Sequence, residues 1–245
     1  MSSQKKNSQE RLQQTRALFA YEKSLYDAGA SVVVGIDEVG RGALAGPVTA
    51  AAVVLGAGWQ LLPGLDDSKR LSPRQRTELA ALLKGEAGAA QGYHIAHVEA
   101  AFIDEQGIMP ALRLAMTRAL EGLTENLNNS KDSRNSFLGS APNACCDQLV
   151  PDKILIDGHP LKLFPQEEAI VKGDSKIACI AAASVLAKVA RDELMVEAAE
   201  LYPEYDLASN KGYASVRHQQ AIAKQGLCSL HRRSFCQNFL QESLF

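Results

Sequence analysis

The sequence predicts an α/β protein in which helices cover both faces of a largely buried β-sheet. Segments typical of strands alternate along the chain with segments typical of helices. The strand segments are short, β-branched and almost wholly apolar, as expected of strands that are covered on both sides. With 245 residues, 46% of them apolar, the chain is long enough to bury a sizeable core as one large domain or two small ones.

The first half of the chain begins with an expected helix that leads into two strands. Apolar residues recur at helical spacing over residues 9–28, and Gly29 is a plausible stop. Residues 31–37 and 48–55 have the composition of buried strands. The glycine-rich segment between them is expected to form the connecting turn.

The next helix has the clearest start signal in the sequence. Ser72 is an N-cap residue, Pro73 occupies the first helical position, Gln75 completes a capping box, and Gly85 follows the last turn. Residues 93–98 then predict a short strand. A helical pattern over 100–123 follows, interrupted between residues 107 and 110 by a glycine and a proline.

In the second half, residues 124–152 are rich in Asn, Ser and Asp and lack periodicity, which predicts a surface loop inserted in the domain. Residues 153–158 and 167–174 predict two more strands, each ending in an aspartate next to a glycine. Residues 175–202 predict a long helix with small residues on one side, which therefore lies close to the sheet. Residues 203–245 are expected to form a helical appendix.

Charge and cysteine content exclude several classes of protein. A formal net charge of -2 excludes a strongly basic nucleic-acid coat, although a locally basic groove remains compatible with it. The five cysteines lack metal-finger spacing, and their odd number argues against a disulfide framework. No segment approaches the roughly 20 apolar residues that cross a bilayer. We therefore expect a cytoplasmic protein that does not contact membranes.

Acidic residues end three of the predicted strands, at Asp37–Glu38, Asp157 and Asp174. Sites in open α/β sheets form beyond strand ends, so these side chains are candidates to converge. Crowded carboxylates raise one another's pKa or bind cations, and oxygen-only ligands favour hard ions such as Mg²⁺ or Mn²⁺. Two such ions about 4 Å apart can activate a water and stabilise the leaving oxygen of a phosphoryl displacement. The pattern therefore indicates phosphodiester hydrolysis.

Each acid alone also has an ordinary explanation. Most Asp-Gly pairs are turns, so the recurrence of acids at three strand ends is what favours a site. Asp192 is a competing acid, but Lys188 precedes it by one helical turn and predicts a simple ion pair. Because neighbouring strand residues face opposite sides, either the strand breaks at Glu38 or Glu38 acts through its backbone carbonyl or from an outer shell of the site.

The glycine-rich segment after the first two acids matches neither common phosphate-binding pattern. A Walker A loop requires Gly-Lys-Ser/Thr, and a dinucleotide fingerprint opens a helix, whereas Pro47 here leads into a strand. A run of glycines leaves room beside the acids for a polymer backbone, which bulky side chains would block.

Six segments of the chain, in order, resemble bacterial ribonuclease HII: GIDEVGRGALAGPV, DDSKRLS, ILIDG, IVKGDSKIACIAAASVLAKVARD, NKGYAS and HRRSF. The resemblance covers nearly the whole chain. It implies a single ribonuclease H-like domain with a C-terminal helical segment. It also implies a monomeric endoribonuclease that uses two Mg²⁺ or Mn²⁺ ions to hydrolyse the RNA strand of RNA/DNA hybrids. Such an enzyme also incises 5′ of single ribonucleotides in duplex DNA, leaving 3′-hydroxyl and 5′-phosphate ends.

By position, the resemblance assigns catalysis and metal binding to the four acids, Asp37, Glu38, Asp157 and Asp174. It assigns substrate contacts to the ribonucleotide-reading loop, to a lysine after that loop and to a junction-sensing tyrosine: Gly40, Arg41, Gly42, Lys69 and Tyr213. Ala214 departs from the glycine or proline that is usual after this tyrosine.

Ser184, Lys188 and Arg191 form one stripe of the long helix, either facing substrate phosphates or carrying ordinary surface charge. Two other functions stay open at this point. One is a related nuclease acting on branched or all-DNA substrates, and the other is a nucleic-acid-binding module with a degenerate site.

Overall fold

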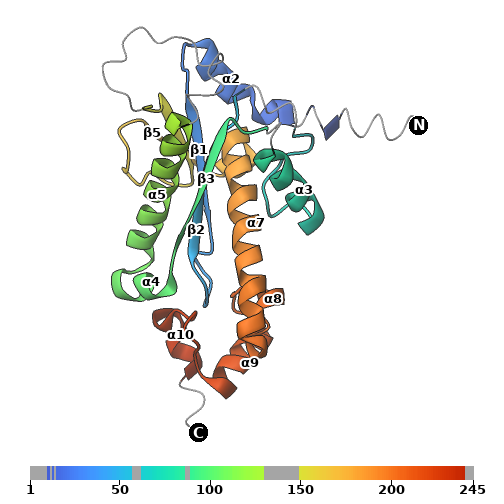
Figure 1. The fold of residues 1–245 in the computed structure, drawn as a ribbon, viewed down its shortest axis with the longest axis vertical. Helices are drawn as coiled ribbons and strands as arrows, with labels where there is room; N and C mark the ends of the chain where they lie inside the picture. The colour runs from blue at the N-terminus through green and yellow to red at the C-terminus, as the bar shows by residue number, and fades with distance from the viewer. Residues whose placement is uncertain are drawn as a thin grey trace, which may run out of the picture.

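A computed structural model of the protein describes residues 10, 11, 13, 15–56, 62–85, 89–129 and 149–240. Its centre is a five-stranded sheet of order β3-β2-β1-β4-β5 with helices on both sides (Figure 1). The strands are β1 (Val33–Val39), β2 (Val48–Val54), β3 (Gly92–Val98), β4 (Lys153–Asp157) and β5 (Glu167–Ile170). β1, β2 and β3 pair antiparallel, whereas β4 is parallel to both β1 and β5. This mixed, helix-covered sheet confirms the predicted fold class.

Most of the helices follow the expected order along the chain. The helices are α2 (Ala20–Asp27), α3 (Pro73–Lys84), α4 (Ala100–Gln106), α5 (Ile108–Asn129), α7 (Ala178–Leu201), α8 (Leu207–Asn210), α9 (Val216–Gln225) and α10 (Arg233–Leu240). Two 3₁₀ turns are η2 (Gly173–Ser175) and η3 (Pro203–Tyr205). The capping box between Ser72 and Gln75 is present at the start of α3, as predicted. The break between α4 and α5 falls at Gly107, which has a φ of 86°.

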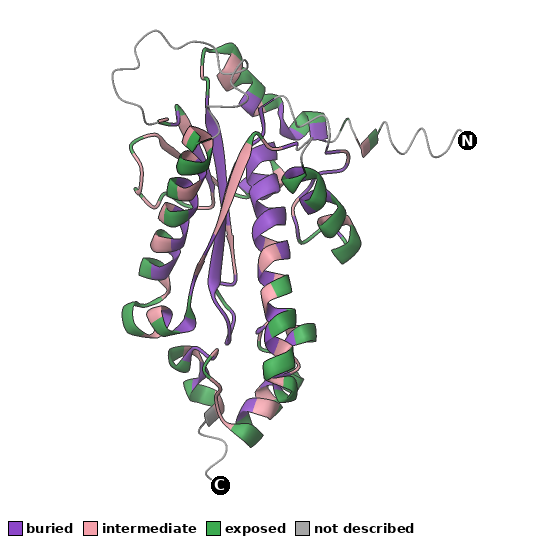
Figure 2. Cartoon of the chain, in the orientation of Figure 1, coloured by how far each residue is buried: buried purple, intermediate pink, exposed green. Residues whose placement is uncertain are grey.

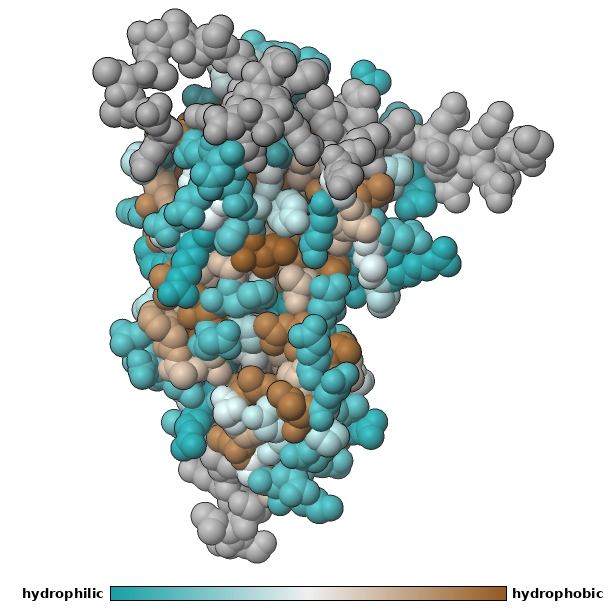
Figure 3. All heavy atoms as spheres, viewed as in Figure 1, coloured by the Kyte–Doolittle hydropathy of each residue, from teal (hydrophilic) through white to brown (hydrophobic). Residues whose placement is uncertain are grey.

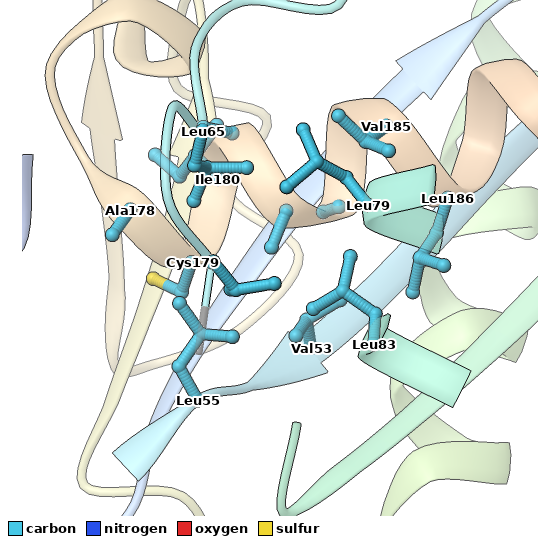
Figure 4. Close-up of a cluster of buried hydrophobic side chains, with 14 of the residues drawn as sticks. Val53, Leu55, Leu65, Leu79, Leu83, Ala178, Cys179, Ile180, Val185 and Leu186 are labelled. Carbon is cyan, nitrogen blue, oxygen red and sulfur yellow. The ribbon is translucent and has the colours of Figure 1, made fainter. Parts of the chain in front are cut away.

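Alternating residues of β1 face two separate cores. Val34 and Ile36 pack in the core under α5, whereas Val33 lies in the core under α7. Both helices turn buried residues towards the sheet (Figure 2). A Cβ atom at Gly35 would lie 2.3 Å from the backbone carbon of Cys179, so only glycine lets α7 approach β1 this closely. Figure 4 shows Cys179 within this apolar cluster, and the contact confirms that α7 lies close to the sheet.

Three predicted boundaries are wrong. α5 continues to Asn129, so residues 124–129 belong to a helix, and most of the remaining expected loop, residues 130–148, lies outside the described residues. β1 runs through Glu38 to Val39. β5 ends at Ile170 because the backbone turns into the left-handed region at Lys172, and Asp174 therefore lies in η2 rather than at a strand end.

The C-terminal segment forms a third core against the end of α7. Leu44 and Ala45 from the glycine-rich turn share this core with Met195, Tyr205 and other buried residues. An isolated bridge joins Ala45 to His231. The segment thus packs against the turn that follows the first two acids.

None of the helices in the described part of the chain is long and apolar enough to cross a membrane. On the face shown in Figure 3, hydrophobic side chains form separate patches among hydrophilic ones.

Candidate functional site

The parallel strands bring the predicted acids to one edge of the sheet. Ile36 pairs with Ile156, so Asp37 and Asp157 are the next residues on neighbouring strands. The Gly173 amide donates a 2.6 Å hydrogen bond to Asp157 Oδ1, which places η2, and with it Asp174, beside the end of β4. The convergence that was inferred from strand ends therefore has a direct structural basis.

Asp37 is the most buried of the four acids, with 3% of its surface exposed. Burial raises the pKa of its carboxyl group well above the ordinary value, and the charges of Glu38 and Asp157 raise it further. A hydrogen bond from the Ser184 hydroxyl and one of 2.8 Å from the Glu38 amide oppose this shift. The ionised form of Asp37 is therefore disfavoured in the free protein, and a nearby positive charge would favour it.

Glu38 belongs to a regular strand, in register with Ala50, so the alternative in which β1 breaks at this residue is wrong. Its side chain is largely buried, with 11% of its surface exposed, and Arg41 Nη1 lies 3.3 Å from its Oε1. Burial raises the pKa of Glu38, whereas Arg41 opposes the rise. Strand alternation directs this side chain to the face opposite that of Asp37. Binding through the backbone carbonyl, or an outer-shell role, stays a prediction.

Lys69 reaches the site from the loop before α3. Its Nζ lies 3.0 Å from Asp174 Oδ2 and 3.9 Å from Asp67 Oδ1. Burial alone would lower the pKa of Lys69, but the hydrogen bond and charge of Asp174, together with the other acids, produce a net rise. The neighbouring Ser68 hydroxyl bonds to that of Ser184 at 2.9 Å, which ties this loop to α7.

The predicted stripe on α7 separates into three environments. Ser184 is buried between Ser68 and Asp37 and contacts both. Lys188 Nζ lies 2.6 Å from Asp192, which confirms the predicted i,i+4 pair. Arg191 is fully buried, so neither a phosphate-facing nor a surface role describes it.

Arg191 instead supports the glycine-rich turn from beneath. Its guanidinium donates to the carbonyl oxygens of Pro47 (2.9 Å) and Ala45 (3.0 Å). Gly40 has a φ of 92°, and a Cβ atom there would meet Arg191 Nε at 2.4 Å and Pro47 O at 2.8 Å. Glycine is thus required at Gly40 both by backbone conformation and by this close approach.

A second buried arginine holds the other side of the same turn. Arg232 Nε donates to Gly46 O and its Nη1 donates to Arg41 O, both at 3.0 Å. Arg41 and Gly42 themselves are exposed. The turn therefore presents an accessible outer surface on a fixed base.

Tyr213 lies next to this turn although it is distant in sequence. Gly212 O accepts hydrogen bonds from the amides of Leu44 (2.8 Å) and Ala45 (3.2 Å). The half-buried ring of Tyr213 has its centroid 5.4 Å from Arg191 Cζ. The structure thus brings together the two elements that the sequence assigned to recognition.

The acids suit a hard divalent cation by the chemistry of their donors. Asp37, Glu38, Asp157 and Asp174 offer only oxygen atoms. Burial raises the pKa of Asp37, and the neighbouring charges of Glu38 and Asp157 add to that rise. In the described residues, however, no three Asp, Glu, His or Cys side chains are arranged as a ligand group. The suitability of these acids for a divalent cation therefore rests on their oxygen donors and their charge, and not on a preformed set of coordinating side chains.

A groove of about 630 Å³ lies along α3, α7 and α8, away from the acids. Arg76, Lys188 and Lys211 line it together with Asp192, Glu193 and Glu197. Because both signs of charge are equally represented, the groove itself does not indicate a polyanion site.

Sequence reasoning gave Arg191 the wrong environment. It missed four other residues that organise the site: Ser68, Arg232, His218 and His231. Arg191 carried a weak signal, because it is a charged residue in a helix of mostly small apolar residues. Arg232 and His231 occur in the HRRSF segment, but nothing in their spacing predicts burial.

Comparison with known proteins gives consistent matches over most of the chain. The family model described as Ribonuclease HII matches residues 34–238. A protein named ribonuclease HII from Moorella thermoacetica is 43% identical over 224 residues, which cover 91% of this chain and 95% of the relative.

Solved structures match the same fold. Ribonuclease H2 from Pyrococcus horikoshii OT3 has a TM-score of 0.64 at 22% identity, covering 86% of this chain and 98% of the other. The structure of the PCNA:RNase HII complex from Archaeoglobus fulgidus contains a chain with a TM-score of 0.59 at 25% identity. That match covers 82% of this chain and 93% of the other.

Proposed function

Because the chain belongs to the ribonuclease HII family, we propose that it is an endoribonuclease that hydrolyses the RNA strand of RNA/DNA hybrids. We include in the proposal incision 5′ of single ribonucleotides embedded in duplex DNA, with 3′-hydroxyl and 5′-phosphate products. The observation that carries the proposal is the meeting of Asp37, Asp157 and Asp174 at one sheet edge, beside a glycine turn with an exposed outer surface.

The proposal assigns two divalent ions, Mg²⁺ or Mn²⁺, to the four acids Asp37, Glu38, Asp157 and Asp174. Such ions supply an activated water and stabilise the leaving oxygen of a phosphodiester. The protein's own contribution is to hold the acids in place. Ser184 fixes Asp37, and the Gly173 amide fixes Asp157.

Lys69 has a separate role in this scheme. Its ammonium group neutralises Asp174 in the free protein, and its side chain is 76% exposed. It is therefore able to contact an incoming phosphate without a large conformational change. The same reasoning places the exposed Arg41 near the substrate backbone, whereas Lys188 is already paired with Asp192. We assign phosphate contacts to Lys69 and Arg41 before Lys188, and we regard Ser184 as a support for Asp37.

Recognition of RNA is assigned to the turn formed by Gly40, Arg41 and Gly42. Backbone amides and carbonyls of this turn can bond a 2′-hydroxyl, which is both a donor and an acceptor. The ring of Tyr213 would pack on the neighbouring deoxyribose and so identify the junction between RNA and DNA.

A cleavage assay on three 5′-labelled duplexes tests the proposal: one with a single ribonucleotide, one RNA/DNA hybrid and one entirely of DNA. We expect Mg²⁺-dependent cleavage of the first two only, with products that carry a 3′-hydroxyl. Cleavage of the all-DNA duplex would indicate the related DNA nuclease, and binding without cleavage would indicate a degenerate binding module.

Isothermal titration of Mg²⁺ provides a readout that does not depend on activity, and Asp37→Asn is expected to weaken the measured binding. A monomeric state and a cytoplasmic location remain predictions from the sequence. Size-exclusion chromatography with light scattering tests the first of them.

A further inference from the structure

The turn that carries Tyr213 is fixed through three successive carbonyl groups. Lys211 and Gly212 have φ angles of 52° and 83°, so this backbone is in the left-handed region and needs external support. The carbonyl of Lys211 is held by Arg191 (2.8 Å), that of Gly212 by the amide of Leu44 (2.8 Å), and that of Tyr213 by a contact to His218 Nδ1 (2.9 Å). The first two anchors belong to α7 and the glycine turn, whereas the third leads into the C-terminal segment.

The third anchor continues through a second histidine. His218 Nε2 lies 3.0 Å from His231 Nε2, and the amide nitrogen of Cys228 lies 3.0 Å from His231 Nδ1. Both imidazoles are buried, with 0% and 3% of their surfaces exposed. The Cys228 thiol sulfur also lies 3.1 Å from His231 Nδ1 and, as a weak donor, suits the same accepting nitrogen. The contacts therefore run from Cys228 through both imidazole rings to the carbonyl of Tyr213.

Only one arrangement of protons satisfies every link of this chain. A backbone amide can only donate, so His231 Nδ1 accepts from Cys228 and His231 Nε2 carries the proton. His231 Nε2 then donates to His218 Nε2, which leaves the proton of His218 on Nδ1. That proton points at the carbonyl of Tyr213, which can only accept and also receives the amide of Ser215 at 2.8 Å. The Cys228 amide at one end and the Tyr213 carbonyl at the other independently require the same direction of proton donation through the two rings.

We propose that His218 and His231 are positioning residues for Tyr213, acting as a directed pair of neutral imidazoles that ties the Tyr213 carbonyl to the C-terminal segment. The inference rests on the proposed function, because it assigns these two residues to discrimination at the RNA–DNA junction. It places α9 and the connection from α9 to α10 in the recognition machinery, although neither of these two elements supplies a predicted substrate contact.

The surroundings of the pair keep both rings neutral. The Tyr205 ring packs edge-on against His231 at 4.7 Å between centroids. Asp206 is the carboxylate near His218, and its charge raises the pKa of that ring by less than burial lowers it. Burial lowers the pKa of both histidines, that of His231 to about 4. A proton added to either ring would set two N–H groups against each other, at His218 Nε2 or at His231 Nδ1.

The arrangement of protons is measurable without substrate. We expect ¹⁵N-resolved imidazole spectra at neutral pH to show His218 as the Nδ1–H tautomer and His231 as the Nε2–H tautomer. The chain contains five histidines, so single His→Gln variants suffice for assignment. The same tautomer at both positions, or a cationic ring at either, would contradict the proposed directed pair of neutral imidazoles.

Two substitutions of similar size separate positioning from bulk stabilisation. The amide of His218→Asn lies where Nδ1 lies and can still donate to Tyr213, whereas that of His218→Gln lies nearer Nε2 and faces His231. For the duplex with one ribonucleotide we expect kcat/KM to fall about fivefold to tenfold in H218Q and less in H218N, as for one lost hydrogen bond. Cleavage of the long hybrid, which presents no single junction, should fall less in both variants.

Comparing the two variants on the two substrates distinguishes a positioning role of the histidine pair from simple stabilisation of the fold. Equal losses in H218Q and H218N, or equal losses on the two substrates at comparable melting temperatures, would show that the pair only stabilises the fold. In a Tyr213→Ala background H218Q should cause no further loss of junction incision, and an additive loss would remove Tyr213 from the pathway. If the wild-type protein cleaves neither substrate, the proposed function fails. The tautomer spectra still test the directed pair of His218 and His231.

Discussion

We expect Glu22→Gln to stabilise the protein at alkaline pH relative to wild type. Glu22 lies in α2 with no exposed surface, and its Oε2 accepts a 3.1 Å hydrogen bond from the Cys179 amide at the start of α7. Its Oε1 has no hydrogen-bond partner among the described residues. Burial raises the pKa of Glu22 from 4.5 to about 7, and the Cys179 amide opposes this rise without cancelling it.

The sign of the pH effect follows from the raised pKa. The folded protein holds the Glu22 proton more tightly than the unfolded chain does, so this contribution to stability is present below pH 4.5 and is lost as the pH rises through about 7. A shift of this size corresponds to about 3 kcal/mol of unfolding free energy. Glutamine carries no charge at any pH and keeps an oxygen for the Cys179 amide. It therefore removes the pH-dependent contribution of this residue to the unfolding free energy.

Urea unfolding of both proteins at pH 5 and pH 8 measures the effect. The stability of Glu22→Gln relative to wild type should rise by about 2.5 kcal/mol between the two pH values, since at pH 5 part of the effect is already lost. Glu78→Gln is a matched control, because Glu78 is exposed on α3 and pairs with Arg74. Parallel pH dependence of wild type and Glu22→Gln would refute the claim that buried Glu22 titrates near neutral pH.

Three further predictions concern the site. Asp37→Asn should abolish cleavage and leave the melting temperature equal or higher, because it removes charge from a crowded cluster; wild-type turnover at saturating Mg²⁺ would contradict it. Arg191→Met should lower the unfolding free energy by about 3 kcal/mol or more, since it leaves buried carbonyls unpaired, and a loss below about 1 kcal/mol in urea titration would count against this role. Tyr213→Phe should retain more junction incision than Tyr213→Ala if ring packing dominates, and the two should match if the hydroxyl dominates.

The parts of the structure that the sequence predicted are those with local signals. The Ser72 capping box and the break at Gly107 depend on residues within one helical turn, and both occur as expected. The acids at the ends of β1 and β4 were found because parallel strands end at a common edge. Asp174 was assigned to the correct edge but to the wrong element, since the turn at Lys172 is a conformational choice that the sequence does not announce.

The residues that the sequence missed or misassigned act through contacts between distant segments. By residue type Arg191 is expected at the protein surface. Only the packing of the glycine turn against α7 shows that its guanidinium group is enclosed. Glu22 likewise looks like an exposed acid of an amphipathic helix until α2 is placed against the start of α7. No spacing rule links these pairs, because each is created by tertiary packing.

The burial of Arg191 and Arg232 has an electrostatic consequence for the site. Both guanidinium groups donate hydrogen bonds to backbone carbonyls. Burial lowers the pKa of both, that of Arg232 to about 10. Because arginine keeps its proton in proteins, both groups stay charged at neutral pH. Neither forms an ion pair with an acid among the described residues. Two positive charges beneath the glycine turn then oppose the repulsion between the clustered carboxylates and an approaching phosphate backbone. The same side chains that fix the shape of the turn thus also favour the approach of a polyanion to it, which a neutral scaffold of equal rigidity would not do.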